Sequence, residues 1–378
     1  FQIAGGWGGG TFVGSVGVTL NNLSIKNFFK KGAWRPYPMG QNQRLSISAQ
    51  TNGTYYKAFA ISFTDPWMGG RKPNSFTISA HYSDENNAYY AWQKGTRYFR
   101  TAGVAAGLGK RLDWPDPYFT FYAEASYERY MLKDWNTFVL KNGAANLLSI
   151  RLVLGRNSVD QPIYPRRGSD FSVSVQLTPP YSLWDGKDYK STALSEQERY
   201  NWIEFHKWML KGQWFTPLTR NGNLVLMARA EMGYLGHYNK NKVSPFERFE
   251  VGGDGMTGYN MYGIDIISMR GYDDGALDPV GSNYSCAYNK YTMELRYPLL
   301  LKGQTNIYVL GFLEGGNGFT SWKEFSPFKI KRSAGIGVRL FLPVVGMVGV
   351  DWGWGFDPAA GQTKRSGSHI HFTMGMQF

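Results

Sequence analysis

Apolar and polar residues alternate along most of this chain. The clearest example places Phe171, Val173, Val175 and Leu177 on one face, opposite Asp170, Ser172, Ser174 and Gln176. A period of two predicts β-strands with one apolar face and one polar face. Together with weaker segments near 95–107, 201–217 and 305–316, the pattern predicts sixteen strands and an all-β fold.

Two all-β architectures fit such strands, a β-sandwich and a transmembrane β-barrel. Long segments follow the fifth, seventh, ninth and eleventh predicted strands, at about 83–94, 132–145, 181–200 and 240–288. Short ones such as 219–222 and 301–304 follow the even strands, and the long segment 21–42 is an exception. A barrel with extracellular loops and periplasmic turns gives this parity, whereas a sandwich has no reason for it. We therefore predict a 16-stranded antiparallel transmembrane β-barrel, one domain spanning 1–378.

Composition and charge agree with a barrel. Glycine occurs 46 times and aromatic residues make up 16% of the chain. Trp67, Trp114, Trp352 and Trp354 fit the aromatic girdles of a membrane protein, although a sandwich core is the alternative. The 41 basic residues exceed the 28 acidic ones but are scattered, which favours an anionic lipid or lipopolysaccharide surface over nucleic acid. Cys286, the single cysteine, excludes an internal disulfide and is interpreted as an unpaired loop residue.

The stretch from Pro245 to Asp274 neither alternates nor repeats, and we interpret 240–288 as one very long loop. Loops of this length are functional or disordered. This one keeps the aromatic residues Phe246, Phe249, Tyr259, Tyr262 and Tyr272, so it is predicted to pack inside the barrel. A buried Arg270 would need a carboxylate or a bound anion. Alternation places Glu294 on the lumen face, and Glu314 is the second expected partner.

The segment Met269-Arg270-Gly271-Tyr272 resembles the Val-Arg-Gly-Phe/Tyr signature of the surface-antigen barrel superfamily. With Val251-Gly252-Gly253-Asp254-Gly255, it is similar to the form associated with Bacteroidota, with Met in place of Val. The resemblance spans the chain and points to the barrel subunit of the β-barrel assembly machinery. It implies that Arg270 anchors the loop in the lumen through Glu294 and Glu314. It also implies N-terminal periplasmic POTRA domains before Phe1.

The two terminal strands suggest a mechanism. Phe1–Gly8 is rich in glycine and would pair weakly with the last strand, Ile370–Phe378. A weak seam could open sideways and template strands of an unfolded outer-membrane protein. The alternative is that the glycines relieve crowding in a curved wall. The residues assigned to this lateral seam are Phe1, Gly5, Gly6, Gly8, Phe372, Gly375 and Phe378.

These features together predict a function. The resemblance implies an outer-membrane assembly factor whose partners are unfolded β-barrel proteins, lipoprotein subunits and membrane lipid. The alternative is a transport pore, either a porin or a two-partner secretion channel. The five histidines are dispersed, and His369 and His371 show the alternation of a lumen face rather than metal spacing. We therefore expect no enzyme activity, metal or other cofactor.

Overall fold

The structure, a computed structural model, describes residues 2–8, 11–51, 55–70, 73–88, 95–255, 263–281, 284–302, 305–342 and 346–374. The chain divides into two compact units. The first comprises Phe1–Leu154, Gln176–His206 and His237–Pro245, and the second comprises Gly155–Val175, Lys207–Gly236 and Phe246–Phe378. No helix in the described ranges has the length and hydrophobicity needed to cross a membrane.

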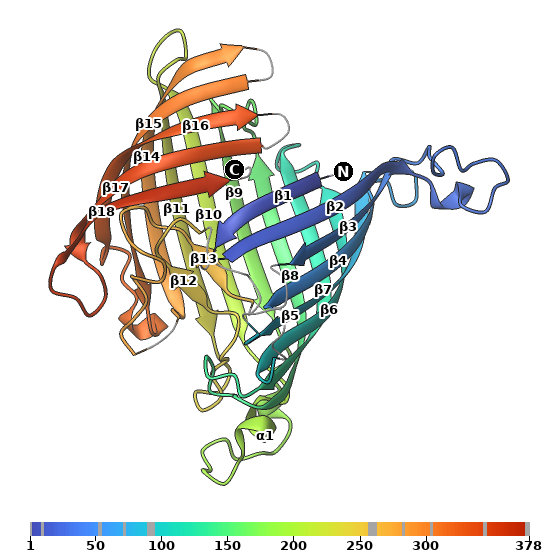
Figure 1. Cartoon of the computed structure of the whole chain (residues 1–378), viewed down its shortest axis with the longest axis vertical. Helices are drawn as coiled ribbons and strands as arrows, with labels where there is room; N and C mark the ends of the chain where they lie inside the picture. Colours follow the sequence, from blue (N-terminus) through green and yellow to red (C-terminus); the bar gives the residue numbers. More distant parts are fainter. Residues whose placement is uncertain are drawn as a thin grey trace. The chain divides into compact units, whose positions relative to one another are not determined.

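Within the described residues, sixteen strands are hydrogen-bonded in chain order, as predicted (Figure 1). The first eight are β1 (Gln2–Gly8), β2 (Thr11–Leu23), β3 (Gln43–Thr51), β4 (Tyr56–Asp65), β5 (Asn74–Asn86), β6 (Tyr98–Arg111), β7 (Phe119–Lys133) and β8 (Gly143–Asn157). The others are β9 (Gly168–Leu177), β10 (His206–Pro217), β11 (Val225–Gly236), β14 (Ala287–Lys302), β15 (Thr305–Phe319), β16 (Lys331–Leu342), β17 (Gly346–Pro358) and β18 (Arg365–Met374).

The helices in the described ranges are short and lie in the connections. They are the 3-10 turns η1 (Ile25–Asn27), η2 (Tyr181–Leu183) and η3 (Trp322–Glu324), and the single α-helix α1 (Glu196–Tyr200). Helix α1 begins at a capping box, in which Ser195 and Glu198 satisfy each other's backbone N–H groups.

The predicted alternation of faces is present in both units. In β4, Ile61 lies opposite Ile47 of β3 and Ala80 of β5, and its side chain is 46% exposed. In β17 the buried Asp351 is followed by Trp352, which is 46% exposed. Exposed apolar rows of this kind suit contact with lipid, and the buried polar rows face the interior.

The long loop runs from 237 to 286, close to the predicted 240–288. One prediction about it was wrong, because it does contain strands. The short strands β12 (Phe249–Val251) and β13 (Asp265–Ile267) pair in parallel within the loop. They are too short for alternation to reveal them.

Cys286 is the last residue of this loop, as interpreted. It is buried and directly precedes β14. Its backbone accepts a hydrogen bond from Leu235 and donates one to Phe319. The thiol is free, as the single cysteine requires.

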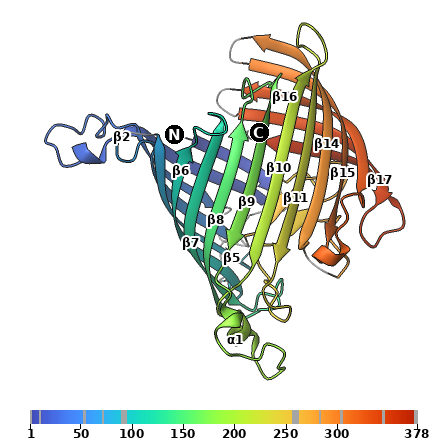
Figure 2. The ribbon, with the colours of Figure 1, turned by 180° about the vertical axis from the view of Figure 1, so that it is seen from behind.

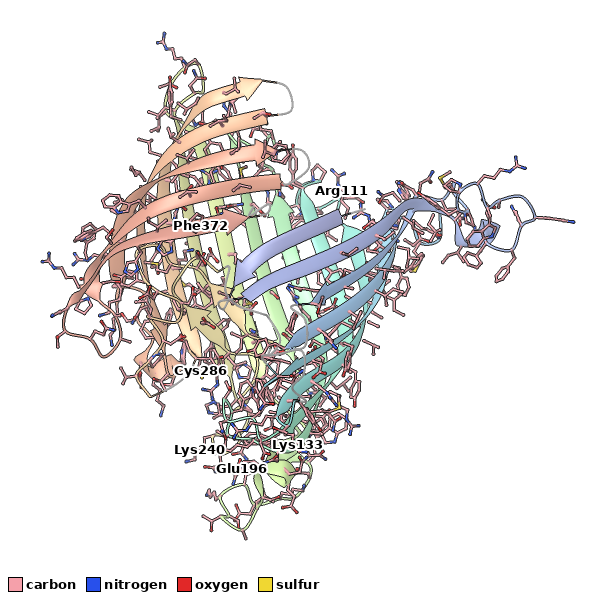
Figure 3. The ribbon with its side chains drawn as sticks, viewed as in Figure 1. Arg111, Lys133, Glu196, Lys240, Cys286 and Phe372 are labelled. Atoms are coloured by element: carbon pink, nitrogen blue, oxygen red, sulfur yellow. The ribbon has the colours of Figure 1, made fainter. Side chains whose placement is uncertain are left out.

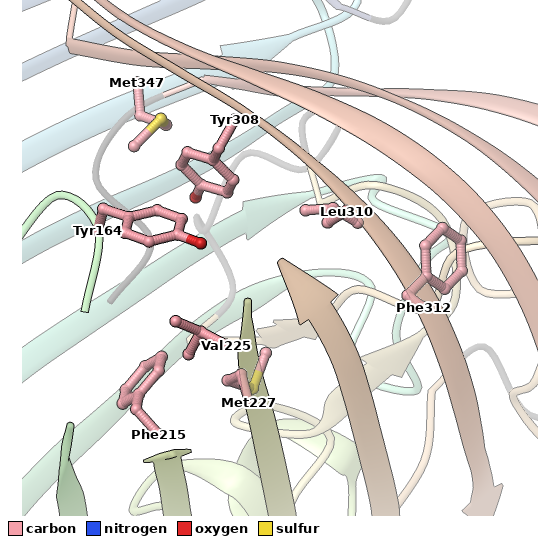
Figure 4. Close-up of a cluster of buried hydrophobic side chains, with 8 residues drawn as sticks. All are labelled: Tyr164, Phe215, Val225, Met227, Tyr308, Leu310, Phe312 and Met347. Carbon is pink, nitrogen blue, oxygen red and sulfur yellow. The ribbon is translucent and has the colours of Figure 1, made fainter. Parts of the chain in front are cut away.

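The interior face of the second unit is not uniformly polar. Val225 and Met227 share a face of β11 with Arg229 and Glu231 and belong to a buried apolar cluster (Figure 4). Tyr164, from the turn before β9, lies in this cluster and donates hydrogen bonds to the backbone oxygens of Asn223 (2.8 Å) and Arg296 (3.1 Å). Strands β10, β11 and β14, which carry much of this face, run side by side in Figure 2.

Candidate functional site

The long loop is packed, as its retained aromatic residues predicted. Phe246, Phe249 and Tyr272 are fully buried, and Met269 is fully buried beside them. Phe249 packs edge-on against Tyr288 of β14, with ring centroids 4.8 Å apart. Tyr259 and Tyr262 lie outside the described residues. Burial of these side chains stabilises one loop conformation, since each large apolar side chain contributes about 1.5–3 kcal/mol.

Arg270 makes both of the predicted ion pairs. Its Nη2 lies 2.7 Å from Glu294 of β14 and 2.7 Å from Glu314 of β15. Glu314 also accepts hydrogen bonds from the Arg270 backbone N–H (2.9 Å) and from Nε (3.1 Å). The guanidinium stacks over the ring of Phe312, 3.7 Å from its centroid. These charge-assisted bonds fix the loop in position and in orientation.

Two further partners of this site were missed by sequence reasoning. Asp351 of β17 lies 3.5 Å from Nη1 of Arg270 and also pairs with Arg339 at 2.7 Å. His371 of β18 accepts a hydrogen bond from the Gly271 N–H at 2.7 Å. Both residues occupy polar positions of an alternating strand, a signal that marks the interior face but not the partner.

Burial alone would lower the pKa of Arg270, but the carboxylates of Glu314, Glu294 and Asp351 raise it well above its ordinary value. The arginine therefore stays charged. The charges around it are balanced by neighbours, because Arg296 pairs with Glu294 at 2.8 Å and Lys290 lies 3.9 Å from Glu314. Such a network holds together as a unit, and removing one member leaves a buried charge without its partner.

The residues flanking Arg270 explain the rest of the motif. Gly271 has a φ of +87°, and a side chain there would meet Ser333 and the backbone of β17 within 3.1 Å. The Tyr272 hydroxyl donates to the Arg332 carbonyl at 2.8 Å. The Met269 N–H donates a hydrogen bond to the Gly253 carbonyl at 2.9 Å, which joins the two glycine-containing parts of the loop.

A second anchor holds the other side of the loop, with its charges reversed. Lys207 projects from β10, and its Nζ lies 2.7 Å from Asp265 and 3.4 Å from Glu247, both in the loop. The lysine is buried and also lies 5.0 Å from the Phe249 ring centroid. Arginine in the loop thus meets carboxylates on the strands, and lysine on a strand meets carboxylates in the loop. The first residues of β10, His206-Lys207-Trp208, gave no sequence signal for this role.

The predicted seam residues are described only in part. Gly5, Gly6 and Gly8 lie in β1, which pairs with β2 along its length, and Phe372 lies in β18 with 56% of its surface exposed (Figure 3). Phe1, Gly375 and Phe378 lie outside the described residues. Strands β1 and β18 stand at the two ends of the strand order.

The long loop also contacts the last strand at a backbone position. The Phe372 N–H donates to the Asp254 carboxylate at 3.2 Å. In an antiparallel ladder, both backbone groups of a residue face the same neighbour, and successive residues alternate between sides. This N–H therefore points away from β17. Asp254 occupies a donor that a further strand would otherwise use.

The fold and the site together define a class, an antiparallel outer-membrane β-barrel with an arginine-anchored loop. The Omp85 superfamily domain matches residues 39–378. This chain belongs to that superfamily and is an Omp85-type outer-membrane protein.

Individual relatives place the chain more closely. It is 23% identical over 317 residues to the outer membrane protein assembly factor BamA of Neisseria meningitidis serogroup B, a match that covers 78% of this chain and 32% of that protein. The chain thus spans about a third of the length of this curated relative. The match supports the resemblance seen in the sequence, to a BamA-like barrel subunit.

Two solved structures share the fold. BamA from Haemophilus ducreyi, lacking POTRA domains 1–3, matches with a TM-score of 0.65 and 17% identity, over 98% of this chain and 67% of that chain. CdiB from Escherichia coli matches with a TM-score of 0.56 and 12% identity, over 96% and 58%. At such identities, the likeness shows the fold alone.

Proposed function

We propose that this chain is the barrel of an assembly factor that folds β-barrel proteins and inserts them into the outer membrane of a Gram-negative bacterium. In this proposal it spans the membrane many times and receives unfolded barrel proteins. BamD-like lipoprotein subunits and N-terminal POTRA domains complete the machinery. The observation that carries the proposal is the sequence similarity to an assembly factor over 78% of the chain.

The proposed step uses the edges of β1 and β18 as a lateral gate. Exposed strand edges pair readily with other strands. Glycines at Gly5, Gly6 and Gly8 provide no side chains to strengthen β1, which favours its exchange of partners. Backbone hydrogen bonds formed in lipid supply the driving force, because unpaired groups there are very costly. The step requires neither covalent chemistry nor a cofactor.

The contacts of the long loop with β18 support a role in this gate. The Gly271 N–H donates a hydrogen bond to the His371 side chain, and the Asp254 carboxylate accepts one from the Phe372 N–H. A loop fixed by Arg270 can therefore hold β18 in place while β1 exchanges partners. This division of roles gives the anchor a function beyond stability.

A disulfide lock tests the gate. In a Cys286→Ser background, one cysteine is placed between Gln2 and Gly8 and one between Arg365 and Met374, and oxidised pairs are selected. We expect locked protein in liposomes to lose acceleration of client-barrel folding, and reductant to restore it. The matched control is Ile3→Cys with Val16→Cys, which joins β1 to its neighbour β2. A locked gate with full activity would contradict the mechanism.

The second candidate is a transport pore of the same superfamily, supported by the fold shared with CdiB. Planar-bilayer conductance separates the two. A steady open pore that does not accelerate client folding would favour transport. A mostly closed barrel that does accelerate folding would favour assembly.

A further inference from the structure

The segment between β2 and β3 is long, although it lies on the side where the other connections are short. Residues 24–42, here called the projection, contain Lys26, Lys30, Lys31 and Arg35 and no acidic residue. Phe29 is 94% exposed and Trp34 is 55% exposed. The projection extends beyond the ends of β2 and β3 (Figure 1).

The exposed aromatic rings are held in a defined structure. The Ser24 N–H donates to the Pro38 carbonyl at 2.9 Å, and the Tyr37 hydroxyl donates to the Asn21 carbonyl at 2.9 Å. Phe28 and Trp34 pack edge to face, with centroids 4.9 Å apart. The structured support therefore keeps the aromatic rings exposed, although contact of apolar rings with water is unfavourable.

The base of the projection lies on the apolar face of the sheet. Gln43 belongs to the same face of β3 as Leu45 and Ile47, because alternate residues of a strand share a face. Its Oε1 accepts from the Ile25 N–H at 2.9 Å, and its amide donates to Asp65 at 2.9 Å. The projection is thus joined to the side of the sheet that faces lipid.

A groove of about 510 Å³ opens at this junction. Its lining includes Lys26 together with the apolar residues Ile25, Phe63, Trp67 and Phe76. Asp65, also in the lining, is occupied by hydrogen bonds from Gln43 and the Trp67 N–H. The groove thus combines one lysine with several apolar side chains, which suits a charged headgroup joined to an acyl chain.

Other connections at this edge of the sheet also expose large aromatic residues. Strands β2, β4 and β6 end at one edge because their neighbours are antiparallel. The turns after β4 and β6 expose Trp67 (48%) and Trp114 (82%). Exposed aromatic and basic residues together are typical of a membrane–water interface.

We propose that the projection and its groove bind the headgroup of an anionic phospholipid at the membrane surface on the short-turn side. The cations attract the phosphate, and the aromatic rings enter the interface. The site would hold the β2–β3 end of the barrel in the bilayer, next to the weak β1 strand. This inference rests on the proposed membrane placement and not on the gate.

A fluorescent probe at an exposed position of the projection tests the site. Phe29→Cys in a Cys286→Ser background is labelled with an environment-sensitive dye, and the full chain is placed in nanodiscs of phosphatidylcholine with or without phosphatidylglycerol. We expect a blue shift in the anionic discs that salt weakens. The test variant replaces Lys26, Lys30, Lys31 and Arg35 by Gln.

The control removes four lysines at the opposite end of the same unit. Lys133 and Lys240 lie at the α1 end, away from Arg111 (Figure 3). The control variant replaces Lys133, Lys187, Lys190 and Lys240 by Gln. In titrations with phosphatidylglycerol, we expect the test variant to need about tenfold more anionic lipid for the same shift, and the control to match the parent.

Three outcomes would overturn the proposal. The first is equal dye emission in the two kinds of nanodisc, which would indicate that this face binds a protein partner instead of anionic lipid. The second is an unchanged shift in the test variant. The third is the same shift on adding soluble glycerol phosphate to protein in detergent, which would indicate a site for free phosphate. Client-folding activity measured in parallel separates failure of this site from failure of the proposed function.

Discussion

At the scale of residues, the space around Gly271 shows why the loop motif tolerates so little change. Its positive φ and its contact with β17 both require a residue without a Cβ. Gly353 and Gly355 on β17 make the matching space, since a Cβ on either would meet Gly271 within 2.8 Å. The arginine next to it is held by carboxylates that have little access to water. Small changes at these positions should therefore have large effects.

Gly271→Ala should weaken loop docking more than Gly281→Ala. Both glycines have positive φ, but Gly281 has no atom within 4 Å of its would-be Cβ. Alanine at either position carries the strain of a positive φ, so the difference in stability between the two variants reports the steric clash at Gly271. We expect this clash to lower the free energy of unfolding by about 1–3 kcal/mol. Denaturant unfolding of the two variants in detergent measures it. Equal midpoints would contradict the tight contact.

Glu314→Gln should destabilise the protein strongly. Glu314 accepts three hydrogen bonds from Arg270, and its removal leaves a buried cation short of a partner, a change that costs about 3–5 kcal/mol. Asp357→Asn is the control because Asp357 also pairs with an arginine, Arg332, which is 64% exposed. The same unfolding assay should show little effect for the control. A similar loss of stability in both variants would show that burial of the ion pair does not change its contribution.

Asp278 makes the loop sensitive to pH. Burial raises the pKa of Asp278 to about 8, despite hydrogen bonds from Ser285 and the Val251 N–H that lower it. The folded pKa lies above the unfolded one, so the loop is most stable below pH of about 4 and loses stability as pH rises through about 8.

Hydrogen exchange at Val251 and Ser285, corrected for intrinsic rates, measures this dependence. Asp278→Asn should flatten it. Asp273→Asn, which changes a carboxyl that is 82% exposed in the same loop, should leave it unchanged. Loop protection that rises with pH would contradict the assignment.

At the scale of elements, the long loop is fixed from two sides. Arg270 joins its second half to β14, β15 and β17, and Lys207 joins β12 and β13 to β10. The parallel pairing of β12 with β13 brings Glu247 and Asp265 to the same lysine. Each half of the loop should therefore respond to its own anchor.

Lys207→Met should release the β12–β13 half of the loop. Two carboxylates lose their cation, and one of them, Glu247, is buried. Hydrogen exchange should accelerate in Phe249–Val251 and Asp265–Ile267 more than in the Met269–Tyr272 segment. Lys211→Met is the control, since Lys211 lies on the same strand but is 48% exposed. Equal acceleration in the two variants would argue against the second anchor.

At the scale of the whole molecule, we propose that the loop occupies the barrel interior. A sixteen-stranded barrel is wide enough for an aqueous channel. We therefore predict that the wild-type protein is mostly closed in planar bilayers. A variant combining Lys207→Met and Arg270→Met should show higher and more frequent conductance, and Lys211→Met should not. Unchanged conductance in the double variant would mean that the loop does not close the pore.

Much of this arrangement could be predicted from local patterns. Alternation located the strands, including the weak ones that became β6, β10 and β15, and connection lengths set their direction. The arginine motif and the polar face of β14 and β15 identified Glu294 and Glu314. In contrast, β12 and β13 have three residues each, too few for a period to appear.

The sequence by itself determined which residues face lipid and that a buried Arg270 needs carboxylates, because periodicity and the cost of burying charge act locally. Only the tertiary structure decided that Asp351, His371 and Lys207 join the anchors. They lie between 40 and 100 positions along the chain from their partners in the loop. Nothing in the neighbouring sequence selects one interior polar residue over another. That choice depends on which strands the folded loop brings within hydrogen-bond distance.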